Sequence, residues 1–201
     1  MNLEYFISSL PMLLEDQPAK ISPAAFAEMC GDQLDPALAA AANEMLGAAP
    51  RPDSASPSPV GASPRPDSAS SRPVGAVLQT APSSHPFLAE WRDREIQLRN
   101  AVAAERARRL GATRPAPRDA HGCEAMISQS VAQAFAAKDP LQRERALDAL
   151  RWRILDELQG IAPFTEAVVL AYAGKLALNA RRFSIEDDKG MEKFKSLTSN
   201  P

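Results

Sequence analysis

Two residues that could do chemistry together, His121 and Cys123, stand two positions apart in the segment RDAHGCEAM. A thiolate beside an imidazole base is the arrangement of nucleophilic cysteine enzymes, and both side chains are also zinc ligands. Zinc sites need three or four clustered ligands, however, and Cys30 and His85 are far away in the sequence. We therefore interpret His121 as a loop histidine and Cys123 as a partly buried cysteine, and expect no metal and no cofactor.

A small helical Cys/His enzyme or metal protein is the alternative interpretation. It predicts that Cys123 is partly exposed, has a lowered pKa and lies within reach of His121 and a carboxylate. If Cys123→Ser left the protein's behaviour unchanged, this alternative would be excluded.

Other catalytic signatures are missing from the sequence. It contains neither the GxxxxGKS or GxxxxGKT pattern of a phosphate-binding loop nor a GxGxxG after a strand. The acidic run Glu186, Asp187 and Asp188 follows Ser184, which is typical of the first turn of a helix, where carboxylates favour the helix dipole. We expect a protein without catalytic activity.

Composition points to a helical protein with protein partners. The chain has 201 residues, 45% of them hydrophobic, and a formal net charge of -2, which argues against chain-wide attraction to nucleic acid or anionic lipid. Two cysteines without a CxxC pair favour a reducing compartment. The N-terminal stretch has no basic region and contains Glu4 and Pro11, so it is not a signal peptide, and no run of about 18 apolar residues could cross a membrane. We expect a cytoplasmic protein without direct membrane insertion.

Residues 48–85 differ sharply from the rest of the chain. They are rich in Pro, Ser and Ala, and they contain a tandem duplication that begins at Arg51 and again at Arg65, with RPDSAS and PVGA repeated intact. Such a segment lacks the apolar side chains needed to form a core, so we predict a disordered linker with polyproline II character. A PxxP docking site is the alternative. We expect removal of residues 50–80 to leave stability almost unchanged.

The remaining sequence reads as successive helices. Four segments place proline at the first helical position behind a capping residue, and three glycines stand where helices would end. The pairs are Ser22-Pro23, Asp35-Pro36, His85-Pro86 and Asp139-Pro140, and the glycines are Gly47, Gly111 and Gly160. This predicts an all-α protein with an N-terminal helical segment over 1–47 and a helical domain over 86–201, which we expect to pack together. The stretch YFISSL is either helical or briefly extended.

The segment from Pro86 to Leu110 carries Trp91 and Leu98 at helical spacing, with arginines and acidic residues such as Glu95 over the remaining surface. We interpret that surface as a solvated, mildly basic helix face. A nucleic-acid-binding face around Arg92 to Arg109 is the alternative, and it predicts salt-sensitive binding. Because the acidic residues are interleaved with the basic ones, we expect no nucleic-acid partner.

The segment DPLQRERALDALRWRILDEL has an apolar arc too wide for a helix lying on one neighbour. The following FTEAVVLAYAGKLALNA is apolar almost all round, with Glu166, Lys175 and Asn179 as its main polar positions, and is therefore expected at the centre of the core. The first helix could pack on this one and present a second edge to another segment or subunit. The candidate interaction or packing surface consists of Trp91, Leu98, Leu141, Leu150, Trp152, Leu155 and Tyr172.

In order along the chain, YFISSLPML, ISPAAFAEMC, FLAEWRDREIQLRNAVAAERARRLG, DPLQRERALDALRWRILDEL and FTEAVVLAYAGKLALNARRFSIEDDKGMEKF resemble a bacterial family of unknown function encoded in V-type ATPase gene clusters. That family is similar to a shortened form of the funnel subunit of V-type and archaeal-type ATPases. The likeness covers nearly everything outside the linker. Its sharpest pieces are LRN, DPLQRER, LRW, LAY and the pair Lys189-Gly190.

The resemblance implies part of an all-helical funnel between the membrane rotor ring and the central stalk, which transmits torque in ion transport without chemistry of its own. It implies the other V-type ATPase subunits as partners and a cytoplasmic position peripheral to the inner membrane. The full-size funnel subunit has three similar helical modules, so 201 residues hold at most part of it. An assembly factor for the ATPase is the alternative, and no individual contact residue can be carried over.

Overall fold

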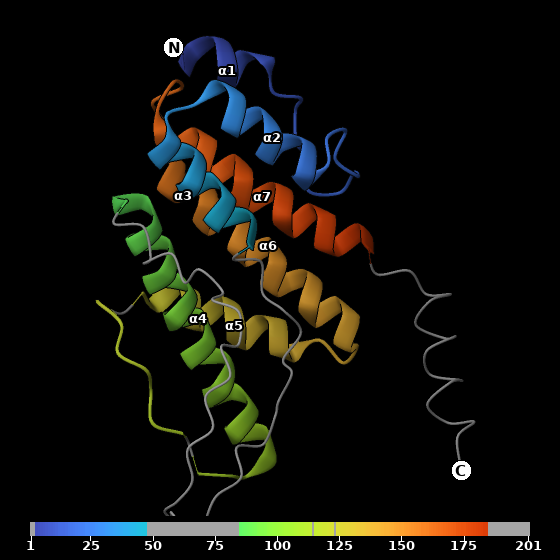
Figure 1. The fold of residues 1–201 in the computed structure, drawn as a ribbon. Helices are drawn as coiled ribbons and strands as arrows, with labels where there is room; N and C mark the ends of the chain where they lie inside the picture. Colours follow the sequence, from blue (N-terminus) through green and yellow to red (C-terminus); the bar gives the residue numbers. More distant parts are fainter. Residues whose placement is uncertain (1–2, 48–84, 114, 123, 185–201) are drawn as a thin grey trace, which may run out of the picture.

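The computed structural model describes residues 3–47, 85–113, 115–122 and 124–184, and this part of the chain is entirely helical, without strands (Figure 1). The helices are α1 (Leu3–Ser9), α2 (Pro23–Gln33), α3 (Pro36–Gly47), α4 (Pro86–Leu110), α5 (Ala125–Ala136), α6 (Pro140–Gln159) and α7 (Glu166–Ser184). The all-α prediction is confirmed, and YFISSL belongs to helix α1. The predicted linker lies outside the described residues except for His85. No described helix is long and apolar enough to span a membrane.

Helices α2, α3, α4 and α6 begin at the predicted prolines. The Ser22 hydroxyl accepts a hydrogen bond from the Ala25 N–H at 3.1 Å, which satisfies one of the unpaired donors of the first turn. The carboxylate of Asp139 does the same for two N–H groups at the start of α6. Gly111 ends α4 in the left-handed conformation (φ 60°), which only a residue without a Cβ adopts at little cost.

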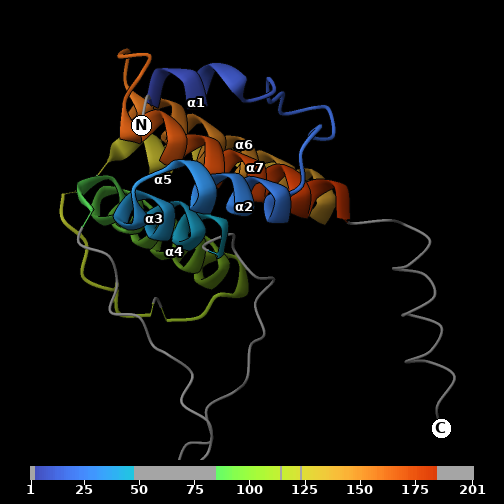
Figure 2. The ribbon, with the colours of Figure 1, turned by 45° about the horizontal axis from the view of Figure 1, so that its top comes forward.

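Helix α7 is the centre of the fold, as its apolar sequence predicted. It packs antiparallel to α6, and α3 and α2 cover its other side, while α1 lies across one end (Figures 1 and 2). Gly174, midway along α7, allows the close approach, because an added Cβ would lie 2.7 Å from the Met45 Cε and 3.0 Å from a Leu155 methyl. Each fully buried leucine or valine in this layer stabilises the fold by about 1.5–3 kcal/mol.

Helices α4 and α5 form the other layer, against α6 (Figure 2). The first half of α4 enters the common core through Phe87, Leu88, Trp91 and Leu98. One continuous cluster of buried side chains contains residues from every helix, so α1–α3 and α4–α7 share a single hydrophobic core. The start of α4 also meets the start of α7, where the His85 Nε2 lies 3.0 Å from a Glu166 oxygen.

Two of the three main polar positions of α7, Lys175 and Asn179, are buried. Lys175 is covered because Asp156 and Gln159 of α6 accept hydrogen bonds from its ammonium at 2.5 and 2.9 Å. Asn179 is covered by the segment between α1 and α2, whose backbone it binds.

The Asn179 side chain joins that connecting segment to α7. Its amide nitrogen donates to the carbonyls of Leu14 and Gln17 at 3.1 and 2.7 Å, and its oxygen accepts from the Ala19 N–H at 2.9 Å. The Tyr172 hydroxyl donates to the Pro11 carbonyl at 2.9 Å. These bonds satisfy backbone groups that have no helix partner, so they order a long connection on the outside of α7.

Candidate functional site

The structure separates the seven residues of the predicted surface into three groups. Trp91, Leu98, Leu150 and Leu155 are buried in the chain's own core and leave no side-chain surface for a partner. Trp152 and Tyr172 are partly buried. Leu141, in the first turn of α6, is exposed at 38%. Only Leu141 is therefore clearly available to another molecule.

The wide apolar arc of α6 is covered by the chain itself. Helix α7 lies along one flank, and α5 and α4 lie along the other. Leu155 packs on α7 beside Gly174, whereas Leu147, Leu150 and Ile154 complete the same core. The sequence left open whether another segment of the chain or another subunit covers the second flank of α6. The structure shows helices of the same chain there, so the buried part of the arc is not presented to a second subunit.

A chain of buried ion pairs crosses α4, α6 and α7. Arg151 is almost fully buried and donates to Glu95 of α4 through Nε and Nη2, at 3.1 and 3.3 Å, and to Asp148 at 3.1 Å. Arg181 of α7 donates to the same Asp148 oxygen at 3.1 Å and to Glu144 at 3.2 Å. Glu95 had been expected on a solvated face. It is buried instead, because two guanidinium groups, those of Arg151 and Arg99, compensate its charge.

The electrostatics of this network keep Arg151 charged. Burial acts to lower the pKa of Arg151, but the neighbouring Glu95 and Asp148 carboxylates outweigh it and the pKa lies above its ordinary value. For Asp148, burial outweighs the two arginines and the pKa is raised. A buried pair of this kind is costly to break and restricts the helices to one register. Its groups all satisfy one another, so we assign it a structural role.

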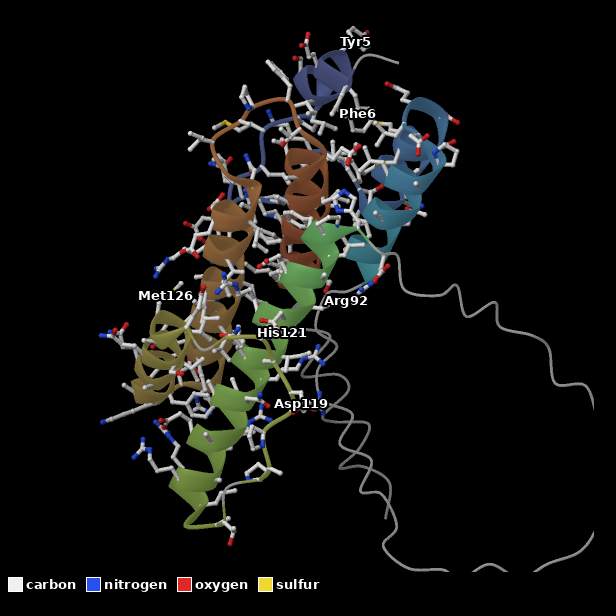
Figure 3. The ribbon with its side chains drawn as sticks, turned by 90° about the vertical axis from the view of Figure 1, so that its left-hand side faces the viewer. Tyr5, Phe6, Arg92, Asp119, His121 and Met126 are labelled. Atoms are coloured by element: carbon white, nitrogen blue, oxygen red, sulfur yellow. The ribbon has the colours of Figure 1, made fainter. Side chains whose placement is uncertain are left out.

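A groove with a volume of about 530 Å³ lies between α4 and the segment that precedes α5. Gln97 spans it: its amide donates to Asp93 and to the His121 carbonyl at 2.9 Å each, and its oxygen accepts from the Glu124 N–H at 3.0 Å. Arg94 forms an ion pair with Glu124. Figure 3 shows His121 and Asp119 on the segment that runs beside α4.

The polar groups of this groove mainly attach the segment to the helix. Burial acts to raise the pKa of Asp93, but hydrogen bonds from the His121 N–H and from Gln97 outweigh it, so the pKa lies below its ordinary value. The His121 ring is fully exposed, with Nδ1 at 3.4 Å from Asp93. Within the described ranges no three potential ligands are grouped to hold a metal ion. Cys123 lies outside them, so the Cys123–His121 alternative stays a hypothesis.

Apolar side chains are exposed at the end of the molecule formed by α1 and the connection between α6 and α7. Tyr5 is 73% exposed and Ile161 is fully exposed, and Phe164 is about half exposed. Figures 1 and 2 both place α1 beside that connection, and Figure 3 shows Tyr5 at the tip. We call Tyr5, Ile161 and Phe164 the apolar end. Met12 and Leu14, on the segment that continues from α1, are exposed as well.

The sequence reasoning missed the apolar end and the network. Ile161 and Phe164 stand in a short proline-containing connection between two predicted helices. Large apolar residues in such a connection indicate an exposed contact surface, so the sequence could have predicted this end. The pairing of Glu95 with Arg151 had no such signal, because the two residues are far apart in the sequence.

A family model described as a protein of unknown function (DUF2764) matches residues 119–200, which is less than half of the chain and includes α5, α6 and α7. Neither a curated protein nor a solved structure matches the chain. The matched range includes Asp148, Arg151 and Arg181 of the network but not Glu95.

Proposed function

We propose that this protein is a non-catalytic subunit of a V-type ATPase that acts at the junction of the rotor ring and the central stalk during ion transport. It would reside at the cytoplasmic side of the inner membrane, held there by other subunits. The observation that carries the proposal is the apolar end, because three large exposed apolar side chains, gathered on α1 and on the connection between α6 and α7, are typical of a protein contact.

The residues on which the family resemblance rests are consistent with a mechanical role. In LRN, Leu98 is in the core and Asn100 holds the Arg118 backbone at 2.8 and 3.0 Å. The motif DPLQRER is the capped start of α6, and LRW contains Arg151 of the network. These residues determine how helices pack, and a subunit that transmits force needs a rigid body of this kind.

The charge of the N-terminal part adds to the description of the partner surface. Residues 3–47 contain seven carboxylates and one lysine. Three of these carboxylates, those of Glu15, Asp16 and Glu44, pair with arginines. At the apolar end, Glu4 is next to Tyr5 and Glu166 is close to Phe164 in the sequence. A partner surface that is apolar with a basic rim fits this end, and an anionic lipid surface does not.

Affinity purification of the V-type ATPase from cells that express the tagged chain tests the proposal. We expect the wild-type chain to be present in the assembled, active complex, and the variant Tyr5→Ser/Ile161→Ser/Phe164→Ser to be lost from it. The matched control is Phe183→Ser, an exposed aromatic residue in the last turn of α7, which should be retained.

An active, fully assembled complex that never contains the wild-type chain would refute the subunit proposal. An assembly factor would still be compatible with that result. A deletion strain with normal ATPase assembly and normal ion pumping would exclude both roles.

A further inference from the structure

The end of the molecule opposite the apolar end carries two arginines on one aromatic ring. The guanidinium carbon of Arg143 lies 4.9 Å from the ring centre of Phe135, and that of Arg109 lies 5.3 Å from the same centre. Phe135 is at the end of α5, Arg109 is in the last turn of α4, and Arg143 is in the first turn of α6. We call these three residues the Phe135 cluster.

Neither arginine has a carboxylate partner among the described residues. This distinguishes them from Arg92, Arg94, Arg99, Arg108, Arg151, Arg181 and Arg182, which all form ion pairs. The Arg143 Nε is buried without an acceptor, and its Nη2 reaches only the Ala137 carbonyl, at 3.4 Å. A guanidinium has five N–H donors, so both groups retain donors for an external anion.

Two like charges on one ring repel each other, and an anion bound to either guanidinium reduces that repulsion. The ring holds both guanidinium planes through cation–π contacts and so keeps them oriented before a ligand arrives. Carboxylates are suited to this geometry because they accept two parallel N–H bonds from one guanidinium.

Two exposed leucines are close to the arginines of the cluster in the sequence. Leu110, which follows Arg109, is 81% exposed, and Leu141, two residues before Arg143, is exposed as well. A protein segment with both carboxylates and apolar side chains would use all four residues. A nucleic-acid backbone would use only the arginines, and Phe135 is too buried to stack on a base.

We propose that the Phe135 cluster binds an acidic, leucine-containing segment of a partner protein, with carboxylates on Arg109 and Arg143 and apolar side chains on Leu110 and Leu141. This inference does not depend on the ATPase role, because it concerns the opposite end of the molecule from the apolar end.

Fluorescence anisotropy of the full chain tests the proposal. The probes are a labelled oligoglutamate peptide, the same peptide with leucines interspersed, and a single-stranded DNA oligonucleotide of equal net charge. We expect the leucine-containing peptide to bind tightest. Arg109→Glu and Arg143→Glu should each weaken its binding by about tenfold or more.

The matched control is Arg153→Glu, which reverses an exposed arginine of α6 that also lacks a described carboxylate partner, ten residues or roughly 15 Å along the helix from Arg143. It should leave the affinity unchanged. Leu110→Ser and Leu141→Ser should weaken binding of the leucine-containing peptide and leave binding of the plain oligoglutamate unchanged.

Arg143 also covers Phe135, so circular dichroism and thermal unfolding accompany each variant. Arg143→Lys keeps the charge but loses the paired donors, so its affinity should lie between those of the wild-type chain and Arg143→Glu. Arg109 is exposed, so Arg109→Glu decides the matter if Arg143→Glu unfolds. Failure of the wild-type chain to bind either peptide would overturn the proposal. An equal loss in Arg153→Glu, or tighter binding of the oligonucleotide than of either peptide, would overturn it too.

Discussion

The two sides of α6 differ in how their central contact is made. Towards α7 it is close packing around Gly174 and Leu155, and ion pairs made by Lys175 and Arg181 of α7 lie beside it. Towards α4 it depends on the buried pair of Glu95 with Arg151. The first kind of contact needs no specific partner. The second is specific, because removing either partner leaves a buried charge alone.

Removing a tryptophan gives the largest expected effect, and it tests the apolar packing that accompanies these contacts, with Trp91 on α4 and Trp152 on α6. Trp91→Ala should lower the free energy of unfolding by about 3–5 kcal/mol, because the side chain is only 4% exposed and its removal leaves a cavity. Trp152→Ala is the matched variant and should cost clearly less, since that ring is partly exposed. Chemical denaturation followed by circular dichroism measures both. Equal losses would mean that burial does not control stability here.

Breaking the ion pair tests the other side. Glu95→Ala should lower the free energy of unfolding by about 3 kcal/mol, because Arg151 then remains charged and buried without its main partner. The double variant Glu95→Leu/Arg151→Met removes both charges and should recover most of that loss. If the double variant were as unstable as the single one, the packing of these side chains, and not their charges, would be the stabilising factor.

Gly174 tests how closely the apolar side is packed. Gly174→Val should cost about 1–3 kcal/mol, because the added methyl groups meet Leu155 and Met45 in a filled space. Gly174→Ala is the control. Its single Cβ would lie 2.7 Å from the flexible end of Met45 and 3.0 and 3.1 Å from two Leu155 methyls. The gain of up to about 1 kcal/mol in helix propensity offsets part of this crowding, so alanine should cost less than valine. Thermal unfolding of the two variants would reveal a loose interface if valine were tolerated as well as alanine.

Alkaline pH gives the smallest expected effect, through Cys30. Burial raises the pKa of this thiol from 9.0 to about 11 in the folded protein. As the pH rises above 9, the unfolded chain therefore loses the proton first, and the free energy of unfolding falls until the folded-state pKa is reached. Cys30→Ala should reduce the fall between pH 8 and pH 10.5 by about 1–2 kcal/mol. Part of the remaining decrease in the free energy of unfolding comes from Tyr172, because burial raises the pKa of its hydroxyl to about 12. An identical pH profile in the variant would contradict a protonated, buried thiol.

Local signals accounted for much of the fold. A proline at the first helical position and a capping side chain before it act within a few residues, so the starts of α2, α3, α4 and α6 were all predicted correctly. The apolar run of α7 likewise predicted its central position, because a helix without a polar face must be surrounded.

The candidate sites were predicted much less well. Helical periodicity identifies which side chains avoid water, but it does not say whether the same chain or another one covers them. The sequence therefore could not decide whether this chain or a partner buries Trp91, Leu98, Leu150 and Leu155. In the fold, the chain's own helices bury them. Leu141 is exposed because it lies in the first turn of α6, beyond the end of that core.

The amino-acid sequence alone was sufficient to establish the helical class, the starts of four helices and the absence of the common phosphate-binding motifs, because each of these depends on residues close together in the chain. The packed structure was needed to show that Glu95, Lys175 and Asn179 are buried, and that Arg109 and Arg143 share one ring. The cause is the same in each case. A polar group is buried or left exposed according to partners from distant segments, and those partners meet only when the helices pack.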